Sequence, residues 1–373
     1  MKKIIGIVSE YNPFHAGHAW HISETRRIAG EESVIVCCMS GDFVQRGEWA
    51  IQSKFLRAEA AVRGGADAVF ELPLPWCLSS AQRFAAGSVG MLARLGITHL
   101  SFGSECGSLE TLREAAAVLS APDFEHRVRD RMRSDPSLSY PAARKREGGD
   151  RIPDSPNDML AVEYLLALQG TSIEPICVPR TGRGHDERGD GPFPSASELR
   201  ARITAGVLPL PHADNDAFSL AILSRLRMFE RSYFEALPDC ADGLGIRIFD
   251  AVRRSTSLPE IFDAAKTKRY THSRVRRAVM CAALGVMKGE NEGLPPYARL
   301  LAADENGRAF LTERRKNSSI PVITRPKQIS LLGKREKAVF ARGASAHDLY
   351  QLAWDPAKPV GCGDDYRTGP FLV

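Results

Sequence analysis

A chain of 373 residues is longer than a single hydrophobic core usually supports, so two domains are expected. Its 43% hydrophobic and 25% charged residues are typical of a folded globular protein and argue against extensive disorder. The N-terminal apolar run is short and lacks a small-residue cleavage site, and no segment approaches the roughly 20 apolar residues of a membrane-spanning helix. We therefore expect a cytoplasmic protein without a membrane partner.

Basic residues are unevenly distributed, although the formal net charge is only +5. Residues 264–289 contain seven Lys or Arg and no Asp or Glu, and residues 313–342 contain nine against two. Charge runs are commonly just solvated faces. Clustering of one sign in the C-terminal half nevertheless suits a polyanionic partner such as a nucleic acid.

The eight cysteines form no CxxC pair and have no histidine spacing typical of zinc. HExxH and EF-hand patterns are absent as well, so we assign no protein metal ligands and expect any Mg²⁺ to arrive with nucleotide phosphates. The cysteines are interpreted as reduced, mostly buried thiols. They stand at Cys37, Cys38, Cys77, Cys106, Cys177, Cys240, Cys281 and Cys362.

Segments rich in β-branched residues alternate with segments of helical periodicity from the N-terminus to residue 119. The predicted strands cover 3–9, 33–39, 67–72 and 97–103. The predicted helices cover 18–29, 53–63, 79–95 and 109–119. This alternation predicts an α/β fold with a Rossmann-like, doubly wound parallel sheet.

The pattern changes after residue 122, where a charged helix and a connection containing Pro and Gly reach residue 156 and are interpreted as an insertion. An apolar helix, a strand, a Gly-rich loop and a further helix then follow, at 158–168, 173–178, 182–191 and 197–203. We place the end of the catalytic domain, 1–205, at this point. Residues 206–373 are predicted to form a mainly helical, basic second domain, with helices at 218–229, 245–255, 258–267 and 273–286.

The first predicted strand leads into Glu10-Tyr11-Asn12-Pro13-Phe14-His15-Ala16-Gly17-His18. Ligands of open α/β sheets bind outside the carboxyl ends of the strands. Gly17 allows the backbone to approach a ligand closely, and His18 falls in the first turn of the next helix, whose free amides and dipole favour phosphate. Two histidines three residues apart can also simply cap or pack, but this position indicates a nucleotide site.

Chemistry at an α-phosphate requires fixed donors that stabilise its developing negative charge, and His15 and His18 could be those donors. GxGxxG and GxxxxGK[ST] are both absent from the chain. Dinucleotide-dependent oxidoreductases and P-loop enzymes therefore lose support, and the phosphate site must be built differently.

Further candidates lie along the same predicted edge of the sheet. Ser195 to Arg200 combines hydroxyls at a helix start with an arginine one turn later, which suits a triphosphate, although an N-cap serine and a solvated arginine fit nearly as well. The segment Ser40 to Glu48, and Lys54 with Arg57, follow the second strand, where surface charge is the alternative. Gly103 could approach adenine or ribose through its backbone. Ser197, Arg200 and Lys54 join the two histidines as candidate catalytic residues.

With these residues in place, the chain resembles the tRNA(Met) cytidine acetate ligase family over nearly its whole length. The motifs that carry the resemblance are EYNPFHAGH at 10–18, SGDFVQRGEWA at 40–50, SKFLRAEAAVRGGADAVFELP at 53–73, FGSE at 102–105, PND at 156–158, SASELR at 195–200 and RYTHSRVRRAVMCAALG at 269–285. Several long motifs in the correct order are far more specific than HxGH alone.

The resemblance implies a two-step reaction on ATP, acetate and elongator tRNA(Met). Acetate would attack the α-phosphate of ATP to give acetyl-adenylate and pyrophosphate, and the wobble cytidine would then accept the acetyl group as N4-acetylcytidine. His15 and His18 would stabilise the phosphate during adenylation. The implied ATP contacts are Val8, Ser9, Glu10, Tyr11, Asn12, Pro13, Phe14, His15, Ala16, Gly17, His18, Ala19, Trp20, His21, Gly103, Asn157 and Arg180.

Two departures and two alternatives accompany this hypothesis. The loop from Arg180 to Asp186 is one residue shorter than the family pattern, and Trp49 replaces a frequent proline. A small-molecule adenylyltransferase of coenzyme biosynthesis is the main alternative, although such enzymes are typically shorter and lack a basic helical extension. A non-catalytic RNA-binding protein is the other. The oligomeric state is left open.

Overall fold

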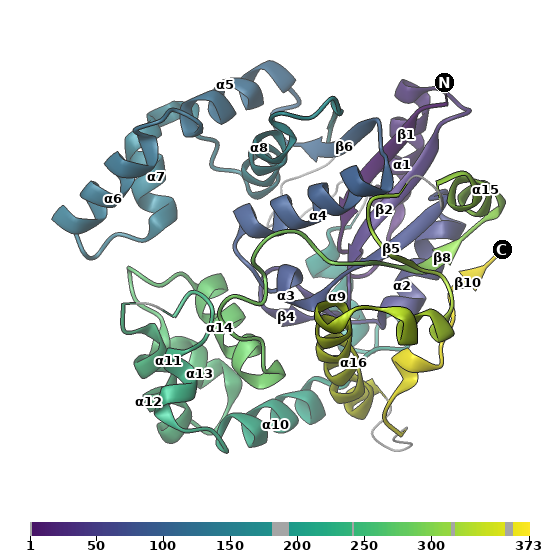
Figure 1. Cartoon of the computed structure of the whole chain (residues 1–373). Helices are drawn as coiled ribbons and strands as arrows, with labels where there is room; N and C mark the ends of the chain where they lie inside the picture. Colours follow the sequence, from purple (N-terminus) through teal and green to yellow (C-terminus); the bar gives the residue numbers. More distant parts are fainter. Residues whose placement is uncertain (1, 181–193, 241, 315–317, 355–360) are drawn as a thin grey trace.

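The computed structural model describes residues 2–180, 194–240, 242–314, 318–354 and 361–373. Its centre is one sheet with the order β10-β8-β5-β2-β1-β6-β7, to which β9 adds beside β8 (Figure 1). The strands are β1 (Ile4–Ser9), β2 (Val34–Ser40), β5 (Ala68–Leu72), β6 (His99–Ser104), β7 (Glu174–Pro179), β8 (Ala298–Ala303), β9 (Val322–Ile323) and β10 (Phe371–Leu372). Strands β3 (Phe43–Val44) and β4 (Glu48–Trp49) form a separate antiparallel hairpin.

The central strands are buried on both faces, which accounts for their continuous apolar runs. Alternate residues point to opposite faces. On one face, Ile5 and Ile7 pack with helices α1 (Ala16–Ala29) and α2 (Lys54–Arg63). On the other face, Ile4 packs with α4 (Ala81–Leu95), α5 (Leu109–Leu119) and α8 (Pro156–Leu168). The predicted doubly wound α/β fold is confirmed, with every predicted element up to residue 119 in place.

The predicted insertion forms two helices rather than one. Helix α6 (Phe124–Ser134) is followed by α7 (Tyr140–Gly148) and a 3-10 turn at Gly149–Arg151, where the sequence analysis expected an irregular connection. The pair buries a small core of its own, made by Phe124, Val128, Leu138 and Ala143. It projects from the sheet beside α5 (Figure 1).

The region after residue 205 begins as a helical lobe, as expected. Its elements are α10 (Asn215–Leu226), α11 (Arg231–Glu235), α12 (Leu244–Arg254), α13 (Leu258–Ala265) and α14 (His272–Leu284), and they follow α9 (Ala196–Thr204). Residues such as Phe218, Ile248 and Val279 give α10–α14 a core separate from the two sheet faces. Figure 1 shows this helical lobe below the α6–α7 pair.

The chain then returns to the sheet, which the sequence analysis did not predict. Strand β8 pairs antiparallel with β5, so that Leu300 lies opposite Phe70, and every residue of β8 is buried. Helices α15 (Glu305–Arg314) and α16 (Lys334–Trp354), and the 3-10 turns η2 (Pro326–Leu331) and η3 (Asp364–Tyr366), complete the fold. The C-terminal region is therefore mainly helical but also supplies β8, β9 and β10, and the domain division at residue 205 stays a prediction.

The described helices include none long and apolar enough to cross a membrane.

Candidate active site

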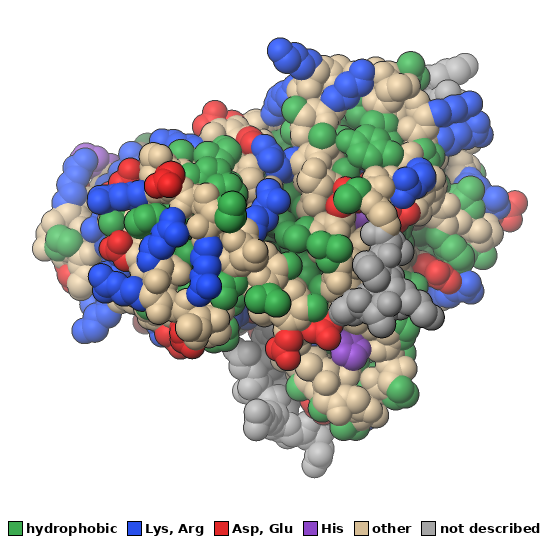
Figure 2. Space-filling model, turned by 90° about the horizontal axis from the view of Figure 1, so that it is seen from below, with side chains coloured by type: hydrophobic (Ala, Val, Ile, Leu, Met, Phe, Trp, Pro, Cys, Tyr) green, Lys and Arg blue, Asp and Glu red, His purple; other side chains and the backbone are tan. Residues whose placement is uncertain are grey.

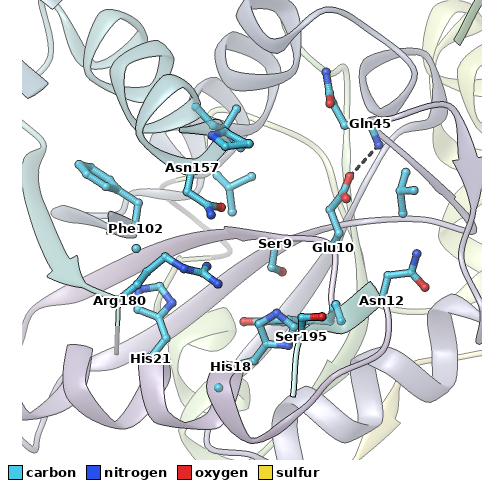
Figure 3. Close-up of a pocket in the computed structure, with 18 of the residues that line it drawn as sticks. Ser9, Glu10, Asn12, His18, His21, Gln45, Phe102, Asn157, Arg180 and Ser195 are labelled. Carbon is cyan, nitrogen blue, oxygen red and sulfur yellow. Dashed lines mark hydrogen bonds between the residues drawn. The ribbon is translucent and has the colours of Figure 1, made fainter. Parts of the chain in front are cut away.

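A cavity of about 390 Å³ opens at the carboxyl ends of β1 and β6 (Figure 3). These neighbouring strands lead in opposite directions through the sheet, to β2 and β7 respectively, so the cavity lies at the topological switch point where α/β sheets bind ligands. Most of the predicted catalytic residues and nucleotide contacts line it. They are Val8, Ser9, Glu10, Tyr11, Asn12, His15, Gly17, His18, Trp20, His21, Gly103, Asn157, Arg180 and Arg200.

Six of the predicted site residues do not line the cavity. The rings of Phe14 and Tyr11 pack edge to face, with their centroids 5.0 Å apart. The Phe14 ring also occupies the space that a side chain at position 64, now Gly64, would need. The hydroxyl of Ser197 accepts a hydrogen bond from Arg200 at 3.2 Å and so supports a lining residue. The others outside the lining are Pro13, Ala16, Ala19 and Lys54.

The two motif histidines form a stacked pair at the start of α1. His15 is the N-cap, and its Nδ1 accepts a hydrogen bond from the Gly17 amide at 3.1 Å, while Nδ1 of His18 accepts from the His15 amide at 3.3 Å. The ring centroids are 3.7 Å apart. Because both Nδ1 atoms accept, a neutral ring must carry its proton on Nε2, which makes each ring a donor toward a ligand.

The histidine cluster is uncharged at physiological pH. Burial is the main cause, and the nearby Arg180 cation the second, that together lower the pKa of His15 and of His21 to about 4. Burial is also the main cause that holds the pKa of His18 well below its usual value, followed by His15, His21 and Arg180. Three neutral imidazoles and the amino end of a helix can therefore accept a phosphate group without protonation.

Arg180 and Asn157 form the opposite wall of the pocket from Asn12 and Gln45 (Figure 3). Asn157 donates its amide to Glu105, whose carboxylate also lies 4.0 Å from Arg180 Nε. The turn that carries Glu105 is fixed by buried Asp158, which accepts from Ser104 Oγ at 2.5 Å and from the amides at 105 and 106 at 2.9 and 3.1 Å. Hydrogen bonds thus join the PND motif at 156–158 to the FGSE motif at 102–105. The loop that follows Arg180 lies outside the described residues.

Arg200 reaches the pocket from α9, where Ser195 is the N-cap residue and accepts from the Glu198 amide at 3.1 Å. The guanidinium donates to the Asn12 carbonyl at 2.9 Å. Burial lowers the pKa of Arg200, although a guanidinium stays charged. The serine therefore caps the helix, whereas the arginine lines the cavity instead of being solvated, and its binding of a triphosphate stays a prediction.

The segment at 40–48 contributes Val44, Gln45, Arg46 and Glu48 to the lining. The amide of Gln45 donates to Glu10 Oε1 at 2.7 Å, which ties this segment to the end of β1. Apolar side chains complete the wall and were not singled out from the sequence. Phe84, Phe102, Met159, Leu160, Tyr164 and Val178 look like ordinary core residues of helices and strands, and no local pattern distinguishes them.

Lys54 is fully buried away from the pocket. Its Nζ lies 2.6 Å from Asp365 Oδ2 and 2.9 Å from Glu71 Oε1, and 1% of the side chain is exposed. Burial alone would lower the pKa of Lys54, but Asp365 and Glu71 raise it above its ordinary value. The structure does not support a catalytic contact for Lys54, because its ammonium group is enclosed by carboxylates. One of them, Asp365, comes from the C-terminal turn η3, which sequence spacing could not reveal.

Arg57 is likewise buried and structural. Its guanidinium donates to the carbonyls of Glu10 at 2.5 Å and Ser40 at 3.2 Å, and also to that of Gly41. These carbonyls end the first two strands of the sheet, so Arg57 holds the strand ends that shape the pocket rather than facing solvent.

The fold and this site define a nucleotidyltransferase of the HIGH class, since residues 1–361 match the family model described as HIGH Nucleotidyl Transferase. Among particular proteins, the chain is 35% identical to the tRNA(Met) cytidine acetate ligase of Fervidobacterium nodosum, over 98% of this chain and 94% of that one. It is 33% identical to the ligase of the same name from Clostridium novyi, over 99% of each. The chain belongs to the tRNA(Met) cytidine acetate ligase family.

Solved structures agree with this assignment. Thermotoga maritima TmcAL in its apo form I matches with a TM-score of 0.88 at 27% identity, covering 100% of this chain and 99% of that one. The form II structure of the same protein, bound with alpha-thio ATP, matches with a TM-score of 0.89 at 26% identity over the same shares. The resemblance stated from the motifs is thereby confirmed.

Proposed function

We propose that this chain adenylates acetate with ATP and transfers the acetyl group to N4 of the wobble cytidine of elongator tRNA(Met). The observation that carries the proposal is the stacked, neutral His15 and His18 pair at the amino end of α1, in a cavity at the switch point of the sheet. Membership of the family supports the substrates, and the cytoplasm, where tRNA is modified, is the proposed location.

The hydrogen-bond donors of the pocket suit the first step, the adenylation of acetate. A carboxylate oxygen of acetate attacks the α-phosphorus of ATP, and pyrophosphate leaves with the electron pair of the broken P–O bond. Charge on the phosphoryl oxygens would be met by Nε2–H of His15 and His18, by the α1 amides and by Arg180 or Arg200. Mg²⁺ would be held mainly by the phosphates and water.

The helical lobe formed by α10–α14 has a basic surface that suits the phosphates of tRNA. Figure 2 shows Lys and Arg side chains gathered over the part of the molecule formed by α10–α14. Exposed basic residues of this lobe include Arg231, Arg247, Arg253, Arg254 and Lys266. Phosphate contacts of this kind release counterions, so tRNA affinity should fall steeply as salt concentration rises. A flat salt dependence would argue against this part of the proposal.

The test is transfer of radiolabelled acetate to an elongator tRNA(Met) transcript in the presence of ATP, beside a transcript that carries uridine at the wobble position. Label on the cytidine transcript alone is the expected result. No label on either transcript, together with ATP–pyrophosphate exchange that depends on a phosphorylated vitamin precursor, would favour the small-molecule adenylyltransferase instead.

A further inference from the structure

Glu10 is an acidic side chain in a pocket that otherwise collects donors for phosphate. It follows the last residue of β1 and lines the cavity beside Gln45, away from Asn157 and Arg180 (Figure 3). Oε1 accepts from the Gln45 amide at 2.7 Å and lies 3.5 Å from Ser40 Oγ. Oε2 has no hydrogen-bond partner among the described residues. The adenylation step leaves this carboxylate without a role.

The charge of Glu10 makes it a poor neighbour for a triphosphate but a good one for an amino group. A carboxylate accepts hydrogen bonds and repels phosphate oxygens, whereas an exocyclic amine donates. Arg46 and Arg200 both interact electrostatically with Glu10 and favour its ionised form. The pocket therefore has phosphate donors at the histidines and Arg180, and an acceptor at Glu10 that Arg46 and Arg200 hold in its ionised form.

Acetyl transfer, the second half of the proposed reaction, needs a group that accepts the proton of the attacking amine. From this arrangement of the pocket we infer that Glu10 is the general base for acetyl transfer, taking a proton from N4 of the target cytidine. The inference rests on the proposed function. The N4 nitrogen attacks the acetyl carbonyl carbon and a C–N bond forms. The bond between that carbon and the phosphate oxygen breaks, AMP leaves with its electron pair, and the N4 proton moves to Glu10 Oε2.

The other titratable groups of the pocket suit this step less well. Nδ1 of His15 and of His18 already accepts a backbone amide, and His21 Nε2 lies 3.1 Å from Ser101 Oγ. With pKa values near 4, His15 and His21 are also weak bases. Burial raises the pKa of Glu10 above its ordinary value, although the hydrogen bond from Gln45 and the charges of Arg57 and Arg46 lower it. Glu10 is therefore a stronger base than an exposed carboxylate.

The test separates the two half-reactions in the full-length protein. Glu10→Gln keeps an oxygen that can accept from Gln45 but removes the base. Acetyl transfer to tRNA(Met) should fall by about 100-fold or more, as expected for loss of a general base, and this fall should be far larger than any change in acetate-dependent ATP–pyrophosphate exchange. Glu10→Asp, which retains a carboxylate with a shorter reach, should transfer faster than Glu10→Gln. Glu24→Gln, on the outer side of α1 and paired with Arg27, is the matched control.

The pH dependence of transfer gives a second readout. The single-turnover transfer rate of wild type should decline as pH falls through the pKa of Glu10, and Glu10→Gln should lack this decline. The charged and titratable groups that face Glu10 are Arg46, Glu48, Arg57, Cys77, Tyr164 and Arg200. Because these groups are common to both proteins, the difference between the two profiles reports on Glu10.

Three outcomes would overturn the inference. Transfer by Glu10→Gln at the wild-type rate would exclude Glu10 as the base. An equal loss of exchange and transfer would place Glu10 in acetate or ATP binding, and equal transfer by the Asp and Gln variants would exclude proton acceptance. A wild-type protein without acetate-dependent exchange would instead refute the proposed function itself, which the Glu10 variants do not test.

Discussion

Two groups of charged residues lie near the same edge of the sheet, and they behave differently. In the buried cluster, defined here as Asp42, Lys54, Glu71, Arg299, His347 and Asp365, the side chains form ion pairs with one another. Lys54 Nζ, Arg299 and His347 Nδ1 all lie within 3.3 Å of carboxylate oxygens. In the pocket, His15 Nε2, His18 Nε2 and Glu10 Oε2 form no hydrogen bond with a described residue, and all three residues line the cavity. Charged side chains that pair with one another therefore stabilise the fold, whereas polar atoms without a protein partner are available to bind substrate.

The largest effect should come from breaking the buried cluster. Lys54→Met leaves three buried carboxylates near one another without their shared cation, so the free energy of unfolding should fall by about 3–5 kcal/mol. Urea denaturation measures this. Arg63→Met, which removes an exposed ion pair with Glu59, should cost less than about 1 kcal/mol. Equal stability of the Lys54 variant and wild type would contradict the structural role.

Substitutions in the pocket should instead reduce activity strongly and stability only slightly. His18→Ala should lower acetate-dependent labelling of tRNA(Met) by about 100-fold to 1,000-fold, because one fixed donor to the phosphate is lost. Stability should change less than in Lys54→Met, since the substitution removes one cap hydrogen bond and ring contacts but leaves no buried charge unpaired. Unchanged product formation in His18→Ala would show that the site has been assigned to the wrong residues.

A smaller effect is expected where a buried carboxylate supports the pocket without lining it. Asp158→Ala frees the turn at 104–106 and the start of α8, and so loosens Glu105 against Asn157. The KM for ATP should rise about tenfold, equivalent to about 1.4 kcal/mol, with a lesser effect on kcat. Asp150→Ala, at an exposed position nearby, should leave the KM for ATP unchanged. An unaltered KM in the Asp158 variant would separate this turn from nucleotide binding.

The smallest effect concerns the pH dependence of the buried cluster. Burial would lower the pKa of His347, but Asp42, 2.7 Å away, raises it above 6.5 overall. Since the folded-state pKa is the higher one, this stabilisation is fully present below pH 6.5 and is lost as pH rises through the folded pKa. The difference in urea midpoint between wild type and His347→Gln should therefore shrink as pH rises above 6.5. A difference that grows over this range would contradict the assigned charge of His347.

The sequence was informative where periodicity and motif spacing are local. Strand and helix alternation predicted the elements to residue 119, and the position of HxGH after the first strand led to the pocket. It failed where distant segments meet. The burial of Lys54 could not be foreseen, because Asp365, which encloses its ammonium group, lies more than three hundred residues away. Ala298–Ala303 was not recognised as a strand, because a short run of Ala and Leu equally suits a helix.

The apolar wall of the pocket was unpredictable for a related reason. Tyr164 and Leu160 belong to an apolar helix, and its sequence indicates that they are buried. The same apolar sequence is expected whether a side chain packs against the sheet or lines a cavity. Glu10 was included among the nucleotide contacts, but its separation from the phosphate donors became visible only when Gln45 and Arg180 were placed on opposite sides of the pocket.

The most direct test of the central claim is ATP–pyrophosphate exchange by the purified full-length protein without tRNA, with acetate as the only carboxylate substrate. Our account predicts exchange that depends on acetate and falls by about 100-fold or more in His18→Ala. Exchange that proceeds equally without acetate, or that is unaffected by loss of the His18 ring, would contradict it.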